Sequence, residues 1–397
     1  MRILMISDVY FPRVNGVSTA IMTLRRELRR MGHDITLIAP DYGTPSDDEE
    51  GILRIPARTV WLDPEDRMMQ RRYISKLLPY LQSQRFDLIH IHTPFVAHYA
   101  GLALGRTLGA PCIETYHTFF EEYLFHYVPL VPKRFMRYFA RAFARSQCDA
   151  LAGLVVPSRP MLDALRQYGI DTYARVIPTG IDLNDFSGGE GARFRTQHGI
   201  APDQAVLLYV GRVAHEKNIG FLLEALAYLK HWHPDILLVI AGEGPALATL
   251  KRRANDLNLA AHARFVGYLD RSRELLDCYR AADLFVFSSR TETQGLVLLE
   301  AMALGLPVVG LAIMGTAEVL KQGQGAHIAQ DDVHHFARTV SALLDSRETR
   351  VALAHSARAY VQEWTAAEMT RRLVNFYEGI VSEYSPVMPH APQRVTG

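Results

Sequence analysis

The sequence is poor in cysteine, lacks a long uninterrupted hydrophobic run and has no excess of charge of either sign. Its 397 residues include three cysteines, Cys112, Cys148 and Cys278, which lie far apart and form no CxxC pair. This number and spacing indicate neither a disulfide framework nor a zinc site. We therefore expect a protein of a reducing compartment.

Charge and hydrophobicity exclude further classes. The 43 lysines and arginines balance 42 aspartates and glutamates, so the net charge of +1 gives no global reason to expect nucleic acid as a partner. The longest apolar stretch, 298–315, contains Glu300 and Pro307 and is interrupted by Gly305, so it predicts a helix followed by a strand and no membrane span. The opening residues MRILMISD form too short an apolar run for a signal peptide. We expect a cytoplasmic protein.

Short runs rich in isoleucine, valine and leucine alternate with stretches of helical period in both halves of the chain. The runs of the first half lie at 3–6, 35–39, 88–91, 112–115 and 154–156, and those of the second half at 205–210, 237–241, 264–266, 284–287 and 308–309. This alternation predicts βαβ units and an α/β fold with two doubly wound parallel sheets. A chain of this length also exceeds the usual size of one core.

These patterns predict four segments. We expect an N-terminal domain at 1–185, a C-terminal domain at 186–365, a helix at 366–385 that can cross back to the N-terminal domain, and a frayed tail at 386–397. Open parallel sheets bind ligands beyond the carboxyl ends of their strands. Residues that follow strands are therefore the first candidates for function.

Three loops that follow predicted strands of the second half are rich in such candidates. They contain Gly211-Arg212 with Lys217, Gly242-Glu243-Gly244, and Glu292-Thr293-Gln294-Gly295-Leu296 with Glu300. The third loop leads into an apolar helix that begins near Gly295. The free N–H groups and the positive dipole end of a helix start favour an anion such as a diphosphate.

The charged residues of these loops have alternative interpretations. Glu300 lies among apolar residues and needs a partner, which is either a sugar diol or a backbone amide or surface lysine. Arg212 and Lys217 either hold a diphosphate whose charge grows as a bond to it breaks, or are solvated near Glu216. The second loop lacks the third glycine of a dinucleotide fingerprint, and the chain has no Walker lysine motif.

Taken together, these motifs resemble the retaining GT-B glycosyltransferases of family 4. The C-terminal motifs that carry the resemblance are Gly211-Arg212-x4-Lys217-Asn218, Gly242-Glu243-Gly244-Pro245, Phe265-Val266-Gly267-Tyr268 and Glu292-x7-Glu300. The N-terminal ones are Ser7-Asp8-x-Tyr10-x-Pro12, Asn15-Gly16-Val17, Tyr116-His117 and Pro178-Thr179-Gly180-Ile181-Asp182. The likeness therefore spans nearly the whole chain.

The resemblance implies a GT-B fold of two Rossmann-like domains that face a cleft, with a nucleotide-sugar donor held mainly by the C-terminal domain. Its implied donor-site residues are Arg212 and Lys217 for the diphosphate, beside Gly211; Glu292 for the sugar hydroxyls; Gly295 and Leu296 for the phosphates; Glu300 for the ribose; Val266 to Leu269 for the base; and Gly16 for close backbone approach. His117 is implied to face the sugar. The family retains anomeric configuration, needs no metal, and is often thought to use the departing diphosphate as the base.

His90 and His92, two residues apart on one strand, share a face and raise the alternative of a metal site. We favour packing or a hydrogen bond at the edge of the cleft. No closely spaced acidic pair ends a predicted strand, so we expect no metal cofactor.

Basic and aromatic segments suggest a membrane-surface acceptor site. The segment 131–148 has no acidic residue and carries Lys133, Arg137, Arg141 and Arg145 every four residues, with Phe135, Met136, Phe139 and Phe143 on another face. Such a helix suits an anionic bilayer, although a core-packed helix with solvated arginines explains the same pattern. Arg25, Arg26, Arg29 and Arg30 form a second basic cluster, and the aromatic run 119–127 either lines an acceptor groove or packs beneath a loop.

Within the family, the segment around His117 and the loop at 291–295 look most like bacterial enzymes that glucosylate diacylglycerol. The leading hypothesis is transfer of glucose from UDP-glucose to a membrane lipid by a cytoplasmic protein bound peripherally to the inner face of the cell membrane. The second is GDP-mannose-dependent mannosylation of a lipid or glycan. The third is a GT-B nucleotide-sugar epimerase or a non-catalytic sensor.

Overall fold

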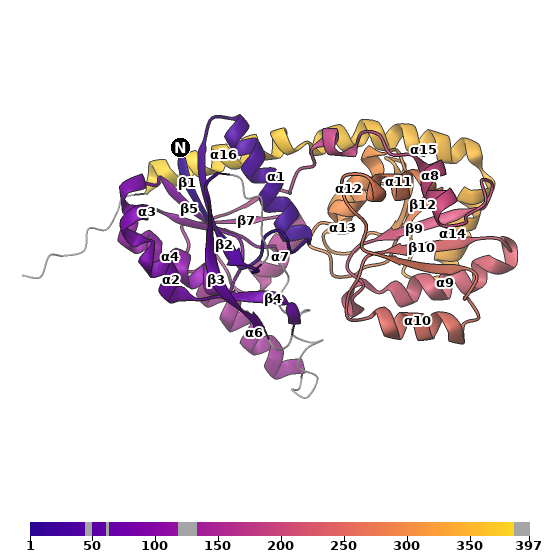
Figure 1. Cartoon of the computed structure of the whole chain (residues 1–397), viewed down its shortest axis with the longest axis horizontal. Helices are drawn as coiled ribbons and strands as arrows, with labels where there is room; N and C mark the ends of the chain where they lie inside the picture. The colour runs from indigo at the N-terminus through magenta and orange to yellow at the C-terminus, as the bar shows by residue number, and fades with distance from the viewer. Residues whose placement is uncertain (44–49, 61–62, 118–132, 385–397) are drawn as a thin grey trace, which may run out of the picture.

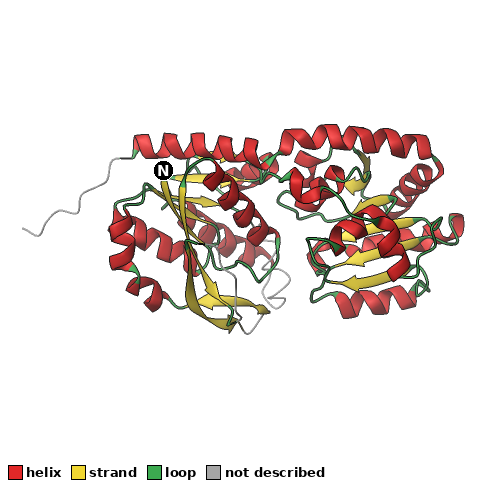
Figure 2. Cartoon of the chain, turned by 45° about the horizontal axis from the view of Figure 1, so that its top comes forward, coloured by secondary structure: helices red, strands yellow, loops and turns green. Residues whose placement is uncertain are grey.

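The computed structural model describes residues 1–43, 50–60, 63–117 and 133–384. It consists of two α/β domains that lie side by side along the long axis of the molecule (Figure 1). Helices cover the sheet of each domain, as Figure 2 shows by secondary structure. The predicted fold class of two doubly wound sheets is thus confirmed.

The N-terminal sheet has eight strands in the order β4-β3-β2-β1-β5-β6-β7-β8. They are β1 (Arg2–Ile6), β2 (Asp34–Asp41), β3 (Ile52–Val60), β4 (Asp63–Met69), β5 (Leu88–Ile91), β6 (Cys112–Thr115), β7 (Gly153–Val156) and β8 (Ala174–Val176). The helices of this domain are α1 (Gly16–Arg30), α2 (Arg71–Lys76), α3 (Leu78–Gln84), α4 (Val96–Leu108), α6 (Lys133–Cys148) and α7 (Arg159–Gln167). The central strands β1, β5, β6 and β7 are buried nearly throughout, which explains their continuous apolar runs.

The edges of this sheet differ from the prediction. Strand β4 pairs antiparallel with β3, so the sheet is mixed and not wholly parallel. The sequence pattern predicted neither β3, β4 and β8 nor the strand Ala326–Ala329 of the C-terminal sheet. Strand β3 carries Arg54, Pro56 and Arg58 between its apolar residues, and β8 is only partly buried or exposed. Strands β4 and β8 are the two edges of the sheet, and β3 lies next to β4 with most of its side chains half-buried or exposed. Such outer strands need no continuous apolar run, because they are open to solvent.

The C-terminal sheet is parallel, with its six strands in the order β11-β10-β9-β12-β13-β14. They are β9 (Val206–Val210), β10 (Leu237–Ala241), β11 (Ala263–Gly267), β12 (Leu284–Phe287), β13 (Val308–Leu311) and β14 (Ala326–Ala329). The helices are α8 (Gly191–Gln197), α9 (Ile219–Trp232), α10 (Leu247–Asp256), α11 (Glu274–Ala281), α12 (Leu296–Ala303), α13 (Thr316–Val319), α14 (Val333–Asp345) and α15 (Arg347–Tyr360). Short 3-10 helices lie at Leu183–Phe186, His215–Lys217 and Val361–Trp364.

The strand orders place a topological switch point in each sheet. Chain order reverses between β1 and β5 in the N-terminal sheet, and between β9 and β12 in the C-terminal sheet. The loops that leave two such strands turn to opposite faces, which opens a crevice at the carboxyl edge. The predicted residues from 211 to 218 and from 292 to 295 follow β9 and β12, so they lie at the switch point of the C-terminal sheet.

The last helix, α16 (Ala366–Glu383), packs on the N-terminal domain. Phe376, Tyr377 and Ile380 are buried in the same core as β1 and β7. A Cβ atom added to Gly153 of β7 would lie 2.7 Å from the Phe376 ring, so glycine permits this close approach. The chain crosses between the domains twice, and the crossings are hydrogen-bonded to each other: Ile181 N–H donates to the Trp364 carbonyl at 2.9 Å, and Ala366 N–H to the Ile181 carbonyl at 2.8 Å. Figure 1 shows α15 and α16 lying along one side of both domains.

The arginines of α1 do not form the second free basic cluster that the sequence suggested. Arg25 is 1% exposed and donates to the Glu50 carbonyl at 2.5 Å, and Arg29 donates to the same carbonyl. Arg26 pairs with Asp182 and Asp185 at 2.9 Å and 2.7 Å, and Arg30 pairs with Glu27 at 2.5 Å. These side chains instead fix α1 to its own domain and to the interdomain linker. The three cysteines are buried and form no disulfide with one another.

Candidate active site

The loops that follow β9 and β12 are joined by hydrogen bonds. The Asn218 side-chain amide donates to the Ser288 carbonyl at 3.1 Å, and the Ser288 hydroxyl donates to the Asn218 carbonyl at 2.9 Å. The Thr291 hydroxyl donates to the Glu216 carbonyl at 3.3 Å. This pairing holds the two loops of the switch point in fixed positions relative to each other.

Lys217 and Glu292 meet across these loops. The Lys217 Nζ atom lies 2.6 Å from Glu292 Oε1, and the two side chains are only 21% and 16% exposed. Arg212, from the same loop as Lys217, lies with its Nη1 atom 3.9 Å from Glu216 Oε1. The structure therefore brings Lys217 against the predicted carboxylate of Glu292, whereas Arg212, from the same loop, is paired with Glu216. This mixture of signs suits a ligand with an anionic part and a hydroxyl-rich part.

Helix α12 begins beside this pair. Gly295 is its N-cap residue, with φ +89, and it provides no side-chain cap. A helix start without a side-chain cap keeps N–H groups available to a ligand and presents the positive end of the helix dipole. The predicted helix start at Gly295 is confirmed, and it lies three residues from Glu292.

The glycines of the second loop let it pack against the first. Val213 N–H donates to the Glu243 carbonyl at 2.8 Å, and Ala246 N–H donates to the Val213 carbonyl at 2.9 Å. A Cβ atom on Gly242 would lie 2.0 Å from the Gly211 carbonyl oxygen, and both glycines have φ values that favour glycine, +136 and +150. The motif Gly242-Glu243-Gly244 thus shapes the backbone beneath Arg212, a role that its sequence alone did not indicate.

Glu300 has partners that the sequence analysis missed. It is 4% exposed; its Oε1 atom accepts from Arg271 Nη2 at 2.7 Å and its Oε2 atom from the Tyr279 hydroxyl at 2.9 Å. The predicted backbone amide or surface lysine is therefore wrong as its partner. Arg271 follows β11, which is separated from β9 in the sheet only by β10. A cation just after the carboxyl end of a predicted strand was the signal in the sequence that could have identified Arg271 as a partner of Glu300. The carboxylate can still accept from a diol, because each oxygen offers a second lone pair.

The N-terminal domain contributes His117, which follows β6. The backbone carbonyl of His117 accepts a hydrogen bond from the Thr293 hydroxyl at 3.0 Å. The side-chain amide of the following residue, Gln294, makes two hydrogen bonds of 2.8 Å with the backbone of Thr179. The loop that contains Glu292 and Gly295 therefore contacts the N-terminal domain directly. The backbone of His117 makes this contact, while its ring contacts His92 of its own domain.

The His117 ring is neutral at ordinary pH. Burial lowers the pKa of its imidazole to about 4. Its Nε2 atom lies 3.2 Å from Nδ1 of His92, whose ring in turn lies 4.0 Å from that of His90. His90 hydrogen bonds to Tyr377 and Thr115, each at 2.7 Å. These contacts agree with the packing and hydrogen-bonding role expected for the histidine pair, and no group of three metal-ligating side chains occurs in the described ranges.

The remaining predicted donor-site residues lie at the carboxyl edges of the two sheets. Gly16 opens α1, is exposed, and has no atom within 4 Å of the position that a Cβ would take. Val266 lies near the end of β11 and is half-buried, and Leu296 is the first residue of α12. The aromatic run at 119–127 lies outside the described residues, as do the side chains of Lys133 and Arg137.

Comparisons with known proteins cover both domains. Residues 14–185 match the family described as Glycosyltransferase Family 4, and residues 192–360 match the family described as Glycosyl transferases group 1. The alpha-monoglucosyldiacylglycerol synthase of Streptococcus pneumoniae is 35% identical over 318 residues, which cover 78% of this chain and 70% of that protein. A GDP-mannose-dependent alpha-mannosyltransferase of Corynebacterium glutamicum is 28% identical, with 96% and 90% covered.

A solved structure has the same arrangement of domains. HepE of Anabaena, in complex with UDP-glucose, superimposes with a TM-score of 0.74 over 96% of this chain and 100% of its own, at 18% identity. This likeness extends to both domains and supports the fold described above.

Gly315 offers a test of how the loop after β12 is held. Its N–H donates to the Glu292 carbonyl at 2.8 Å, and an added Cβ would lie 1.9 Å from the Thr293 carbonyl oxygen. Gly315→Ala must therefore displace residues 292–294, and we expect faster hydrogen–deuterium exchange in peptides that cover 288–296. Gly379→Ala, where a Cβ meets nothing within 4 Å, is the control. Equal exchange in both variants would show that Gly315 does not hold the loop.

Proposed function

This chain belongs to the glycosyltransferase family 4 and group 1 enzymes, and we propose that it transfers glucose from UDP-glucose to a membrane lipid such as diacylglycerol with retention of configuration. The observation that carries the proposal is the contact of Lys217 with Glu292 beside the start of α12. A cation, a carboxylate and free helix N–H groups at one point can hold a phosphate and the hydroxyls of an attached sugar. The acceptor class is inferred from the relatives.

In the proposed donor complex the diphosphate lies against the N–H groups of Gly295 and Leu296, with Arg212 and Lys217 beside it. Glu292 accepts from hydroxyls of the sugar, and Glu300 accepts from the ribose diol, sharing its carboxylate with Arg271 and Tyr279. The base lies near Val266, and Gly16 lets the N-terminal loop approach the diphosphate. His117 faces the sugar from the N-terminal domain.

The proposed reaction breaks the bond between the anomeric carbon and the diphosphate oxygen, and forms a bond from that carbon to the acceptor oxygen. The proton of the acceptor hydroxyl passes to the departing diphosphate. Negative charge grows on the diphosphate as its bond breaks, so Arg212, Lys217 and the α12 dipole stabilise the transition state more than the ground state. Loss of one such group typically lowers the rate about 10²- to 10³-fold. These groups neutralise the charge without a metal ion, and we propose that none is required.

Two features of the N-terminal domain support a lipid acceptor. In the described part of α6, Ala144 and Cys148 are buried while Arg141 and Arg145 are exposed, so the helix packs one side on the core and presents its cations to solvent. Arg141 lies over the Tyr168 ring at 4.8 Å, and Arg145 lies 3.7 Å from Asp149. Arg141 and Arg145 thus also have partners within their own domain, but their charges remain on the surface. None of the described helices is long and apolar enough to cross a membrane.

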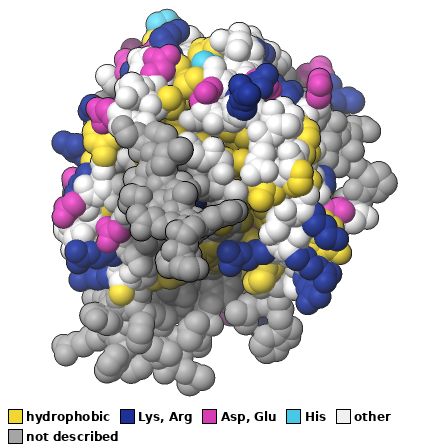
Figure 3. All heavy atoms as spheres, turned by 90° about the vertical axis from the view of Figure 1, so that its left-hand side faces the viewer, with side chains coloured by type: hydrophobic (Ala, Val, Ile, Leu, Met, Phe, Trp, Pro, Cys, Tyr) yellow, Lys and Arg dark blue, Asp and Glu magenta, His cyan; other side chains and the backbone are white. Residues whose placement is uncertain are grey.

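Exposed hydrophobic and basic side chains also occur together at the end of this domain that carries α2, α3 and α4. Figure 3 shows lysines and arginines among hydrophobic side chains on this end face. Large hydrophobic side chains are exposed elsewhere in this domain too: Met68, Phe95 and Tyr99 are 54%, 49% and 45% exposed. The exposed cations of α2 are Arg71, Arg72 and Lys76. Exposed apolar and basic side chains in one domain suit the surface of an anionic bilayer, so we propose peripheral binding to the inner face of the cell membrane.

Product analysis tests the proposed reaction. The protein is incubated with UDP-glucose and vesicles that contain diacylglycerol, in the presence of EDTA, and lipids are analysed by mass spectrometry and NMR. We expect a lipid carrying one α-linked hexose and release of UDP that depends on the acceptor. A product formed only from GDP-mannose would favour the mannosyltransferase hypothesis. UDP release that does not depend on the acceptor, or the absence of any UDP release, would contradict transfer.

Glu300→Ala tests the ribose contact by calorimetry with two ligands, UDP and 2′-deoxy-UDP. A hydrogen bond to a charged group contributes roughly 1.5–3 kcal/mol, so the wild type should bind UDP about tenfold or more tightly than the deoxy compound. In the variant UDP binding should weaken and the two affinities should become equal. Glu348→Ala, an exposed carboxylate of the same domain, is the control. An unchanged preference for UDP in Glu300→Ala would place the ribose elsewhere.

Neutralising Arg137, Arg141 and Arg145 tests the membrane contact. A basic residue near an anionic surface contributes about 1 kcal/mol, so the triple glutamine variant should partition onto anionic vesicles roughly 100-fold less in sedimentation experiments. The matched control neutralises Arg252, Arg338 and Arg347, three exposed arginines of the C-terminal domain. Equal vesicle binding by the two triple variants would show that α6 does not contact the membrane.

A further inference from the structure

A buried histidine lies directly behind His117. His92 is 2% exposed, and its Nδ1 atom lies 3.2 Å from Nε2 of His117. At the other side of the ring, His92 Nε2 is also buried and has no hydrogen-bond partner among the residues that the structure describes. A buried polar atom without a partner destabilises the fold, because it has lost its hydrogen bonds to water. This cost requires an explanation.

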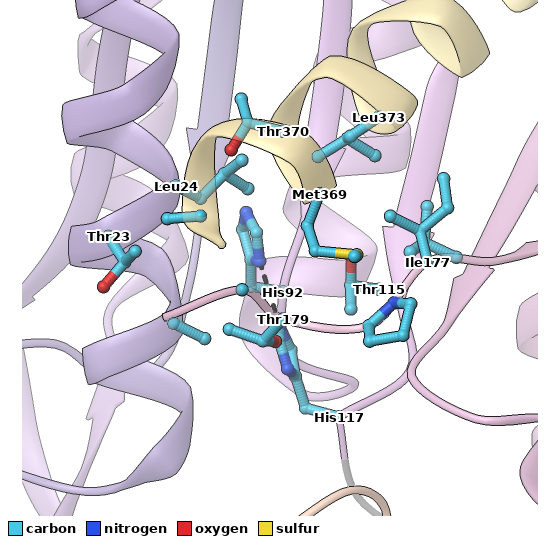
Figure 4. Close-up of a pocket in the computed structure, with 15 residues that line it drawn as sticks. Thr23, Leu24, His92, Thr115, His117, Ile177, Thr179, Met369, Thr370 and Leu373 are labelled. Carbon is cyan, nitrogen blue, oxygen red and sulfur yellow. Dashed lines mark hydrogen bonds between the residues drawn. The ribbon is translucent and has the colours of Figure 1, made fainter. Parts of the chain in front are cut away.

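A small cavity lies next to His92. Its volume is about 40 Å³, and it is lined by side chains of α1, the N-terminal sheet and α16, among them Thr23, Thr115 and Thr370. Figure 4 shows the His92 ring between His117, to which the dashed line runs, and Thr370 of α16. A space of this size with hydroxyl groups in its wall holds one or two water molecules. A water there supplies His92 Nε2 with a partner.

The hydrogen bond between the two rings couples their protonation. Burial lowers the pKa of His117 to about 4 and that of His92 well below its usual value, so both rings are neutral. Each neutral ring carries one proton, and the bond between them needs one N–H and one lone pair. If Nδ1 of His92 carries the proton, it donates to Nε2 of His117, and the proton of His117 is then on its Nδ1. If Nδ1 of His92 carries no proton, Nε2 of His117 carries its proton and donates to it.

The neighbouring groups hold His92 in place. Its ring lies 4.0 Å from that of His90, at an angle of 36°. Both nitrogens of His90 are already engaged, with Tyr377 and Thr115. His90 therefore packs against His92 but does not compete for its nitrogens. On the outer side, the carbonyl of His117 is tied to Thr293 of the loop that contains Glu292.

We propose that His92 is a positioning residue that holds His117 in one tautomer and one ring orientation, and that a water molecule in the cavity is the hydrogen-bond partner of His92 Nε2. The proposal rests on the proposed function in so far as His117 faces the transferred sugar. The free nitrogen of His117, Nδ1, then meets a sugar hydroxyl as either a fixed donor or a fixed acceptor. No rearrangement of protons is needed when the donor binds, which is the advantage of a preorganised site.

Two variants of matched shape test this role. His92→Asn keeps a polar atom near the position of Nδ1, whereas His92→Leu has the same branching without a hydrogen bond. Loss of a group that orients a functional side chain typically costs about 10- to 100-fold, so we expect such a fall in kcat for His92→Leu and a smaller one for His92→Asn. The KM for UDP-glucose and the calorimetric affinity for UDP should stay within about twofold, because the proposed nucleotide contacts lie in the other domain.

Nitrogen NMR of histidine-labelled protein gives a readout that needs no substrate. Signals of His117 are identified by their loss in His117→Gln. In the wild type we expect two widely separated nitrogen shifts, those of a single neutral tautomer, and in His92→Leu two shifts that move toward each other as both tautomers become populated. Tyr377→Phe is the control, because it removes a hydrogen bond of the same buried network from His90 and not from His92.

Averaged His117 shifts in the wild type would overturn the proposal even if His92→Leu failed to fold. Unchanged shifts and kcat in a folded His92→Leu would also overturn it, and so would equal losses in Tyr377→Phe, which would indicate a general packing role. If the wild type showed a single tautomer but no acceptor-dependent transfer, the proposed function would fail while the histidine pair would stand.

Discussion

The contact between Lys217 and Glu292 is the interaction on which the account of this protein depends. It joins the loops after β9 and β12, the two strands between which the chain order of the C-terminal sheet reverses. Any parallel sheet with such a reversal opens a crevice at its carboxyl edge, but a crevice alone does not select a ligand. Here the crevice is equipped with cations from one loop and a helix start and a carboxylate from the other. This pattern of charges supports the proposed site for a phosphate with a sugar attached.

The same loop also reaches the other domain. Thr293 and Gln294 follow Glu292 directly and hydrogen bond to the backbone of His117 and Thr179. A shift of either domain must therefore move the residues next to the proposed diphosphate. The two chain crossings at Ile181 and Ala366 are also hydrogen-bonded to each other. The proposed donor site is thus joined to the N-terminal domain through a few residues.

The sequence predicted the central strands and the helix start at Gly295, because buried parallel strands and glycine-marked turns have strong local signals. It missed the edge strands β4, β8 and β14, and it missed β3, which lies next to β4; strands at or near an edge tolerate mixed polarity. It also missed the partners of Glu300, since Arg271 and Tyr279 are distant in sequence and are brought to it only by packing. The arginines of α1 show the reverse error: their spacing suggested a free basic cluster, but the fold buries or pairs them.

The most direct test of the central claim is the difference in affinity between a nucleoside diphosphate and its nucleoside, measured by calorimetry for the wild type and for Lys217→Gln. With UDP and uridine, and with GDP and guanosine as the second pair, the account predicts that the wild type binds the diphosphate of its preferred base far more tightly than the nucleoside. Lys217→Gln should lose much of that difference while its affinity for the nucleoside is unchanged. A wild type that binds diphosphate and nucleoside equally would contradict a diphosphate site at α12.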